Sequence, residues 1–156
     1  MNYQIRIAVP TDEQKIRELF VEMMTSIHGT EDPDDYYEMY LKDFWAGQED
    51  RIYVAEDREV VAFLSVEVHH EPVKYIYLED FSVTAAYRNQ GIGSELIRTA
   101  ESYARENRIT AVLLHVHKTN KSALRFYERS GYSIYRDDGS RYLLKKDIPA
   151  GCSEKE

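Results

Sequence analysis

The segment Asp80–Gly93, DFSVTAAYRNQGIG, joins a predicted strand to a predicted helix through a loop that contains two glycines. The loop is Arg88–Gly93, and the amphipathic segment Ser94–Asn107 that follows has the periodicity of a helix. The first turn of a helix carries free backbone N–H groups and a positive dipole, and glycine lets a phosphate approach the backbone closely. The pattern therefore predicts a site for a phosphate-bearing ligand.

Two common phosphate loops do not fit this segment. The dinucleotide-binding fingerprint has a third glycine where this chain has Leu96, and no Gly-Lys-Ser/Thr triplet of a Walker loop follows Gly93. The pattern that remains, Arg-x-x-Gly-x-Gly after a strand, resembles the acyl-CoA pyrophosphate loop of the GNAT superfamily (Gcn5-related N-acetyltransferases). By itself, so short a motif also fits an ordinary tight turn between a strand and a helix.

A second segment, Asn120–Tyr132 (NKSALRFYERSGY), resembles the later GNAT element, in which Asn-x-x-Ala precedes a hydrophobic-Tyr pair and Gly-Tyr. Asn120 lies 27 residues after Gly93, with a helix and a strand predicted between them. Gly131 suits the left-handed position that closes a helix. With both motifs in the order and spacing of the family, the resemblance to GNAT covers nearly the whole chain.

The predicted elements follow the GNAT order β-α-α-β-β-β-α-β-α-β-β. The predicted strands are Tyr3–Ile7, Ile52–Glu56, Val60–Val68, Tyr75–Val83, Ala111–Val116, Tyr132–Tyr135 and Arg141–Lys145. The predicted helices carry Ile16, Leu19, Phe20, Met23 and Ile27 after a Thr11–Gln14 capping box, then Tyr36, Tyr37, Tyr40, Leu41 and Phe44, then Ser94–Asn107 and Ser122–Arg129. The resemblance implies an α/β (α+β) GNAT fold, with a mixed, mostly antiparallel sheet of six to seven strands flanked by about four helices.

Composition is that of a soluble globular protein, with 156 residues, 43% hydrophobic and 31% charged. We expect one domain over residues 1–148 and a polar tail over 149–156. No apolar run approaches the ~20 residues that span a bilayer, and the N-terminus lacks a signal peptide. Cys152 has no partner for an internal disulfide. These features predict a cytoplasmic protein without a membrane partner, and a net charge of −8 disfavours nucleic acid and favours cationic partners.

The resemblance implies acetyl-CoA as cosubstrate and assigns its contacts. The backbone of Phe81, Ser82 and Val83 would pair with the pantetheine arm as an added strand does. Arg88 and the side chain of Asn120 would contact the cofactor, as would Phe126. The remaining cofactor-binding residues, which would hold the pyrophosphate, are Asn89, Gln90, Gly91, Ile92, Gly93 and Ser94.

Direct transfer of acetyl from a thioester to an amine requires a neutral amine, a stabilised oxyanion and a proton for the leaving thiolate. The resemblance makes Tyr127 the general acid that protonates the thiolate. Because the chain holds 13 tyrosines, the alternative for Tyr127 is an ordinary core tyrosine.

Glu79 and Asp80 interrupt an otherwise apolar and aromatic strand, and an unpaired carboxylate is costly to bury. The run from Tyr77 to Phe81 resembles the spermidine/spermine (diamine) acetyltransferase branch, which implies that Glu79 is the base and that Asp80 contacts a cationic acceptor. The alternative is a structural ion pair with a neighbouring Lys or Arg. Further acceptor contacts are expected in the acidic segment, at Glu31, Asp32 and Tyr36, although such a cluster is also typical of a solvated loop.

The histidines do not form a metal site, because His115 and His117 lack further ligands at suitable spacing. We expect both to be structural or exposed, and His70 remains a minor candidate for a base or an acceptor contact. No metal is expected.

The sequence thus predicts an acetyl-CoA-dependent N-acetyltransferase that acts on a primary amine of a small cationic molecule, such as a polyamine, a diamine or an aminoglycoside. One alternative is a protein or peptide N-acetyltransferase, of which the ribosomal-protein type is an example. An alternative from another class is a non-catalytic acyl-CoA-binding sensor. A homodimer is compatible with the resemblance, since dimers are common in the family.

Overall fold

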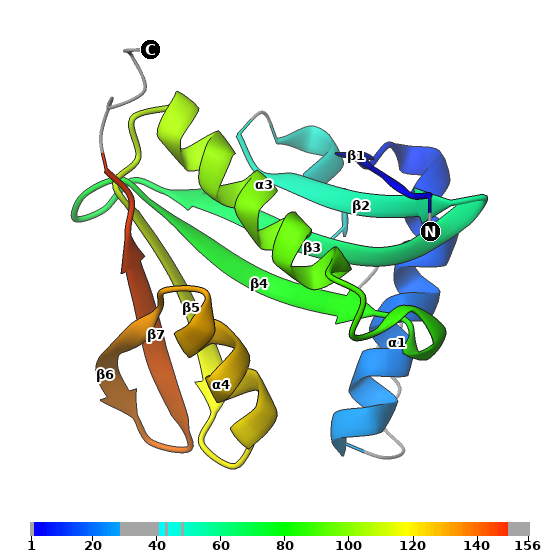
Figure 1. The fold of residues 1–156 in the computed structure, drawn as a ribbon. Helices are drawn as coiled ribbons and strands as arrows, with labels where there is room; N and C mark the ends of the chain where they lie inside the picture. Colours follow the sequence, from blue (N-terminus) through cyan, green and yellow to red (C-terminus); the bar gives the residue numbers. More distant parts are fainter. Residues whose placement is uncertain (1, 29–40, 43, 48, 150–156) are drawn as a thin grey trace. The chain divides into compact units, whose positions relative to one another are not determined.

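The computed structural model describes residues 2–28, 41–42, 44–47 and 49–149 (Figure 1). In this part of the chain, seven strands form one sheet in the order β1-β2-β3-β4-β5-β7-β6. The strands are β1 (Gln4–Ile7), β2 (Arg51–Asp57), β3 (Glu59–His69), β4 (Tyr75–Val83), β5 (Ala111–His117), β6 (Ser133–Asp138) and β7 (Arg141–Asp147). The longer helices are α1 (Glu13–His28), α3 (Ile92–Glu106) and α4 (Lys121–Arg129).

The predicted mixed sheet and the order of its elements are confirmed. The pairs β1–β2, β2–β3, β5–β7 and β6–β7 are antiparallel, whereas β4 and β5 are parallel. Several boundaries differ from the prediction; in particular, α3 begins at Ile92 rather than Ser94, and β3 continues through His69, which was expected in a loop. Of the predicted second helix, residues 41–42 and 44–46 are helical, and the earlier part lies outside the described residues.

The chain divides into two compact units. The first contains residues 1–66 and 80–98, and the second contains residues 67–79 and 99–156. The division passes through β3, β4 and α3. The single domain expected over residues 1–148 stays a prediction.

In the first unit, α1 packs against β2 and β3 through the apolar stripe that the sequence predicted. Ile16, Leu19 and Phe20 are at most 4% exposed and join Val54 and Phe63, which are fully buried, in one cluster. The other buried members of this cluster are Ala8, Leu41, Phe44, Ile52 and Val60. Burial of this helix face supplies most of the stability of α1, since helices of this length are marginal in isolation.

The entry to α1 corrects the predicted Thr11–Gln14 capping box. A short 3-10 turn, η1 (Pro10–Asp12), precedes the helix, and the Asp12 carboxylate accepts a hydrogen bond from the backbone N–H of Val9 at 2.9 Å. Asp12 also accepts two hydrogen bonds from the Arg6 guanidinium, at 2.8 and 3.0 Å, which lower the pKa of its carboxyl. Thr11 lies inside this turn, whose N-cap is Val9, so Thr11 is not the N-cap of the helix.

In the second unit, β5 forms a long pairing with one neighbouring strand and a short pairing with the other. It pairs with β7 along its whole length, from Ala111 to His117, but its recorded pairing with β4 covers only Ile76–Leu78 opposite Val112–Leu114. The hairpin of β6 and β7 turns at Gly139, whose φ is 84°. β6 therefore runs to Asp138, beyond the Tyr135 end that the sequence suggested.

A buried polar network holds the end of α4 in the second unit, where Figure 1 shows the helix beside β5 and β7. The Tyr132 hydroxyl donates to Glu101 at 2.8 Å, and the Lys146 ammonium donates to Glu101 at 3.1 Å and to the Ser130 carbonyl at 2.9 Å. Glu101 is only 5% exposed, so its charge needs these partners. Burial, followed by the Glu101 carboxylate, raises the pKa of Tyr132. The network fixes the helix on which Tyr127 lies.

Candidate functional site

The predicted anion loop lies in the first unit and leads directly into α3. A 3-10 turn, η2 (Ala85–Tyr87), follows β4. The exposed residues 88–91 then lead into α3, which begins at Ile92. Asn89 and Gly91 have φ values of 61° and 88°, so the backbone is left-handed at both positions. A Cβ on Gly91 would meet nothing within 4 Å, which means that its conformation, rather than crowding, favours glycine there.

The rest of the predicted pyrophosphate contacts lie at the helix start. Ile92 is 1% exposed and anchors the loop in the core, whereas Gly93 and Ser94 belong to the first turn of α3. The Gln90 side chain donates to the Ala86 carbonyl at 3.2 Å and so stabilises the loop itself. Because the first N–H groups of a helix have no intrahelical acceptor, this turn offers donors to an anion.

Glu22 of α1 holds the loop in place. Its carboxylate accepts hydrogen bonds from the Thr84 hydroxyl at 2.9 Å, from the Ala85 N–H at 3.1 Å and from the Arg88 guanidinium at 3.3 Å. Arg88 also donates to the Val83 carbonyl at 2.8 Å. Arg88, predicted to support the phosphate charge, therefore already has protein acceptors in this structure, although its side chain is 48% exposed.

The strand segment assigned to the pantetheine arm is the last part of β4. Phe81 and Val83 are half-buried, and Ser82 is buried, with its hydroxyl donating to the Leu19 carbonyl at 3.3 Å. The Ser82 side chain is thus occupied within the protein. The strand-like contact of this segment's backbone with the cofactor stays a prediction.

Asn120 caps α4 in the second unit. Its side-chain oxygen accepts hydrogen bonds from the Ala123 N–H at 3.2 Å and from the Ser122 hydroxyl at 3.4 Å. Asparagine is among the best N-cap residues, so this position has a structural reason of its own. Its predicted contact with the cofactor stays a prediction, as does that of the half-buried Phe126.

Tyr127 is buried on α4 among aromatic rings. Its ring lies edge-on to Phe126 and Tyr132, with centroids 5.0 and 5.8 Å away. Burial raises the pKa of Tyr127 well above its ordinary value, which keeps the phenol protonated at neutral pH. None of the hydrogen bonds found in the described part of the chain involves its hydroxyl, so the proton remains available for donation.

Glu79 is exposed on β4, but it lies among other charged groups of the second unit. The surrounding protein and the Glu67 carboxylate raise its pKa, and Arg141 and His69 act in the opposite direction. A carboxyl whose pKa is raised is a stronger base once ionised than an ordinary glutamate. The role predicted for Glu79 stays a prediction.

The structure gives less information on the other residues that were predicted to contact the acceptor. Asp80 is half-buried, and because it follows Glu79 in a strand, the two side chains point to opposite faces. Glu31, Asp32 and Tyr36 lie outside the described residues. His70 is exposed after the end of β3.

The sequence missed a connected set of polar side chains around His115. Tyr77 Oη lies 2.6 Å from His115 Nδ1, and Asp138 Oδ2 lies 2.8 Å from His115 Nε2. His117 is exposed, as expected. Alternation places Tyr77 and His115 on definite faces of their strands, but only the register between β4, β5, β7 and β6 brings the three side chains together.

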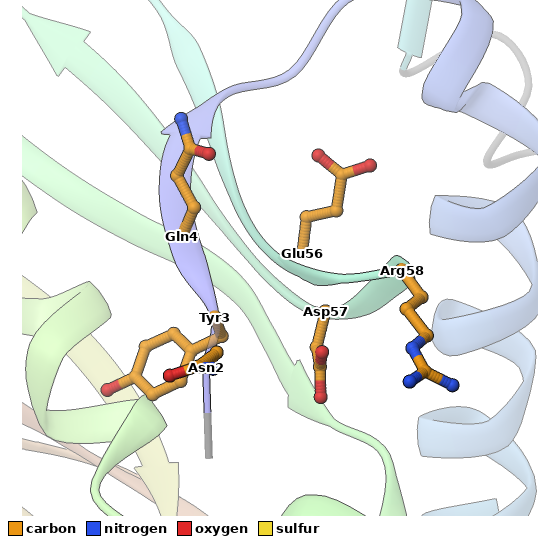
Figure 2. A pocket seen from close by; sticks show the side chains of 6 residues that line it. All are labelled: Asn2, Tyr3, Gln4, Glu56, Asp57 and Arg58. Carbon is orange, nitrogen blue, oxygen red and sulfur yellow. The ribbon is translucent and has the colours of Figure 1, made fainter.

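The surface also has an open depression of about 390 Å³ in the first unit, and Figure 2 shows the six residues that line it. These are Asn2, Tyr3, Gln4, Glu56, Asp57 and Arg58. Glu56 accepts a hydrogen bond from Arg6 at 2.9 Å, and Asp57 accepts one from Tyr87 at 3.0 Å. Its carboxylates are thus engaged in the protein, and it contains none of the predicted site residues.

Neither a metal cluster nor a membrane span is found among the residues that the structure describes. No group of three or more His, Cys, Asp or Glu side chains there could hold an ion. No described helix is long and apolar enough to cross a membrane.

Comparison with known proteins gives a match between residues 13–132 and the model of the acetyltransferase (GNAT) family. A mycothiol acetyltransferase from Corynebacterium glutamicum (strain R) is 29% identical over 90 residues, which are 58% of this chain and 30% of that protein. The chain thus spans less than a third of the length of that relative. N-alpha-acetyltransferase 50 from Danio rerio is 25% identical over 132 residues, which cover 78% of this chain and 79% of the relative.

Solved structures show the same fold. A PaiA N-acetyltransferase from Thermoplasma acidophilum, solved in complex with coenzyme A, has a TM-score of 0.75 and 18% identity, and the match covers 94% of this chain and 99% of that one. Arabidopsis thaliana NAA60, solved with a bisubstrate analogue, also has a TM-score of 0.75 and 18% identity, with 96% and 99% covered. These comparisons do not single out the spermidine/spermine branch.

Proposed function

The chain belongs to the acetyltransferase (GNAT) family, whose cosubstrate is acetyl-CoA, and we propose that it transfers acetyl directly to a primary amine of a small cationic molecule. The observation that carries this proposal is the loop at residues 88–91. It is exposed, is held in a left-handed conformation at Gly91 and opens onto the first turn of α3, which is the geometry of an anion site.

In this proposal the first unit binds the cofactor. The first turn of α3 and the loop from Asn89 to Ser94 hold the pyrophosphate, and the Arg88 guanidinium turns toward it from Glu22. The backbone of Phe81–Val83 pairs with the pantetheine arm. The exposed start of α3 beside the left-handed Asn89 and Gly91 supports this assignment over an ordinary turn.

The second unit supplies the acid and the base. Tyr127 gives its proton to the leaving thiolate, and its place in the motif and a hydroxyl without a recorded acceptor in the described part of the chain support this role. Glu79 takes a proton from the acceptor ammonium, directly or through water. Asn120 and Phe126 are proposed as further cofactor contacts.

The small cationic acceptor is favoured by negative charge on and near β4. Glu79 is exposed, Glu67 lies close enough to raise its pKa, and the whole chain carries a net charge of −8. Asp80, Glu31, Asp32 and Tyr36 are proposed as further contacts with the acceptor. We also place the reaction in the cytoplasm, and the homodimer stays a prediction.

A second candidate is acetylation of a protein N-terminus. The similarity to N-alpha-acetyltransferase 50 supports it, because that match extends over most of both chains. The non-catalytic acyl-CoA sensor remains as a third, and it predicts binding of acetyl-CoA without turnover.

Thiol release from acetyl-CoA should distinguish these functions when the protein is supplied in turn with spermidine, an aminoglycoside, lysine and a short peptide with a free N-terminus. We expect the highest kcat/KM with a small polyamine or diamine. Turnover on the peptide alone would exclude the small-molecule acceptor, and acetyl-CoA binding without thiol release on any amine would support the sensor.

Gly91→Ala should weaken acetyl-CoA binding about tenfold, because a left-handed alanine costs about 1–2 kcal/mol and would shift the loop from its bound conformation. Arg88→Ala should weaken it as well, with a smaller salt dependence of binding. Calorimetric titration with acetyl-CoA measures both. Gly139→Ala is the matched control, since its φ of 84° and open surroundings resemble those of Gly91 in a different turn. Unchanged affinity in Gly91→Ala and Arg88→Ala would remove the pyrophosphate assignment.

Tyr127→Phe should lower kcat on the order of 10²-fold while it leaves the affinity for acetyl-CoA within about twofold, because only the donated proton is lost. Steady-state kinetics with the best amine of the panel provides the measurement. Tyr103→Phe, at a buried tyrosine on α3, controls for loss of a hydroxyl from the core. Wild-type turnover in Tyr127→Phe would show that the residue is a core tyrosine only.

Glu79→Gln should reduce kcat/KM most at low pH, where the acceptor is fully protonated, and should approach wild type as pH rises. In wild type the acid limb of the profile should lie above the ordinary pKa of glutamate, because the base must be ionised and its pKa is raised. Glu67→Gln removes a repelling charge, lowers the pKa of Glu79 and should move this limb to lower pH. An unaltered profile in Glu79→Gln would argue against its role as base.

A further inference from the structure

The loop that is proposed to bind the cofactor is held on both sides by a tyrosine hydroxyl. Tyr87, which directly precedes the loop, donates to the Asp57 carboxylate at 3.0 Å. Glu95, in the first turn of α3, accepts from the Tyr3 hydroxyl at 2.5 Å. These two hydrogen bonds therefore tie the residues on either side of the segment 88–94 to the end of β1 and β2.

Both supports come from the same end of one strand pair. In the antiparallel register of β1 and β2, Gln4 lies opposite Glu56, so Tyr3 and Asp57 occupy the next positions along the two strands. Both residues line the open depression that Figure 2 shows. Asp57 is the last residue of β2 and is paired with Glu59 across the hairpin turn. The two sides of the loop thus share one support in the sheet.

The first hydrogen bond of α3 shows which donors the loop and the helix present. The Glu95 N–H donates to the Gly91 carbonyl at 3.1 Å, so the amides of Ile92, Gly93 and Ser94 come before the first intrahelical bond. N–H groups in this position have no acceptor within the helix and can bind an anion. Glu95, which directly follows these three donors, is the residue that contacts Tyr3.

The charge of Glu95 gives the contact with Tyr3 a second effect. This carboxylate lies in the turn that is proposed to bind the pyrophosphate, and like charges repel. The Tyr3 hydroxyl directs the carboxylate toward the start of β1 and offsets part of its charge. The hydrogen bond to Glu95 raises the pKa of Tyr3, and the hydrogen bond to Asp57 raises the pKa of Tyr87, so both phenols stay protonated as donors.

We propose that Tyr3 and Tyr87 are positioning residues for the cofactor, whose hydroxyls fix the loop so that the N–H groups of residues 92–94 face the pyrophosphate. This inference rests on the proposed function, in which the loop binds that part of acetyl-CoA. Neither tyrosine has to touch the cofactor, because each acts through a residue beside the loop. A displacement of the loop by about 1 Å would lengthen the hydrogen bonds to the phosphate oxygens beyond their favourable range.

The two tyrosines test the position of the loop more directly than Glu22 does. Glu22 also engages Arg88, which is itself proposed to contact the cofactor, so a substitution of Glu22 changes two things at once. Tyr3 and Tyr87 bond instead to Glu95 and Asp57, which are outside the proposed cofactor contacts. Loss of either hydroxyl should therefore affect the cofactor only through the loop.

Two thioesters distinguish a displaced loop from a generally weakened protein. Acetyl-CoA carries the pyrophosphate, whereas S-acetylpantetheine has the same reactive end without phosphate. We expect Tyr3→Phe and Tyr87→Phe each to weaken acetyl-CoA binding about three- to tenfold in calorimetric titration, with melting temperatures near that of the wild type. In steady-state kinetics KM for acetyl-CoA should rise by a similar factor at unchanged kcat, and kcat/KM for S-acetylpantetheine should stay within about twofold.

Asp57 offers a conservative variant that keeps the hydrogen bond. Asp57→Asn retains an oxygen that can accept from Tyr87 and should bind acetyl-CoA like the wild type, whereas Asp57→Ala should resemble Tyr87→Phe. Glu59→Ala is the matched control for loss of a carboxylate, since Glu59 lies opposite Asp57 and pairs with Lys15. We expect wild-type affinity in Glu59→Ala. Equal losses in Asp57→Asn and Asp57→Ala would exclude the hydrogen bond as the cause.

Tyr53→Phe is the matched control for loss of a phenol hydroxyl in the first unit, because this hydroxyl accepts from Arg51 within β2 at 3.1 Å. We expect it to bind acetyl-CoA like the wild type. Wild-type affinity in either Tyr3→Phe or Tyr87→Phe would remove that residue from the role, and wild-type affinity in both would overturn the inference. Equal losses with S-acetylpantetheine would overturn it as well. Failure of the wild-type protein to bind acetyl-CoA would instead count against the proposed function itself.

Discussion

The short parallel contact between β4 and β5 is the constraint on which the proposed chemistry depends. The recorded pairing joins Ile76–Leu78 to Val112–Leu114, and the Tyr77 and His115 side chains flank its last pair. In the proposed complex the pantetheine arm lies along the next part of β4, at Phe81–Val83.

Local patterns in the sequence were sufficient for the elements and for the first part of the site. The stripe of Ile16, Leu19 and Phe20 is buried as expected, and the glycine loop runs from strand to helix as its composition indicated. These features depend on residues close together in the chain, whose periodicity and backbone preference can be read directly. The acetyltransferase family follows from the two motifs for the same reason.

Contacts between distant residues could not be predicted in this way. The sequence around His115 did not indicate Tyr77 and Asp138 as its partners. The register between neighbouring strands cannot be derived from the alternation of residues within one strand. The contact of Glu22 with Arg88 could not be predicted either, since the two residues are 66 positions apart in the chain. The N-cap is Val9 rather than Thr11, and Asp12, which bonds the Val9 N–H, is paired with Arg6 of β1.

The hydrogen bonds between Glu22 and the loop also affect the thermodynamics of cofactor binding. A loop that is already ordered by three hydrogen bonds from α1 loses little conformational entropy when a phosphate arrives. The loop's share of the binding enthalpy is correspondingly reduced, because Arg88 must give up one carboxylate before it meets another anion. Association should therefore show a small heat-capacity change from this region, unlike binding that is coupled to folding.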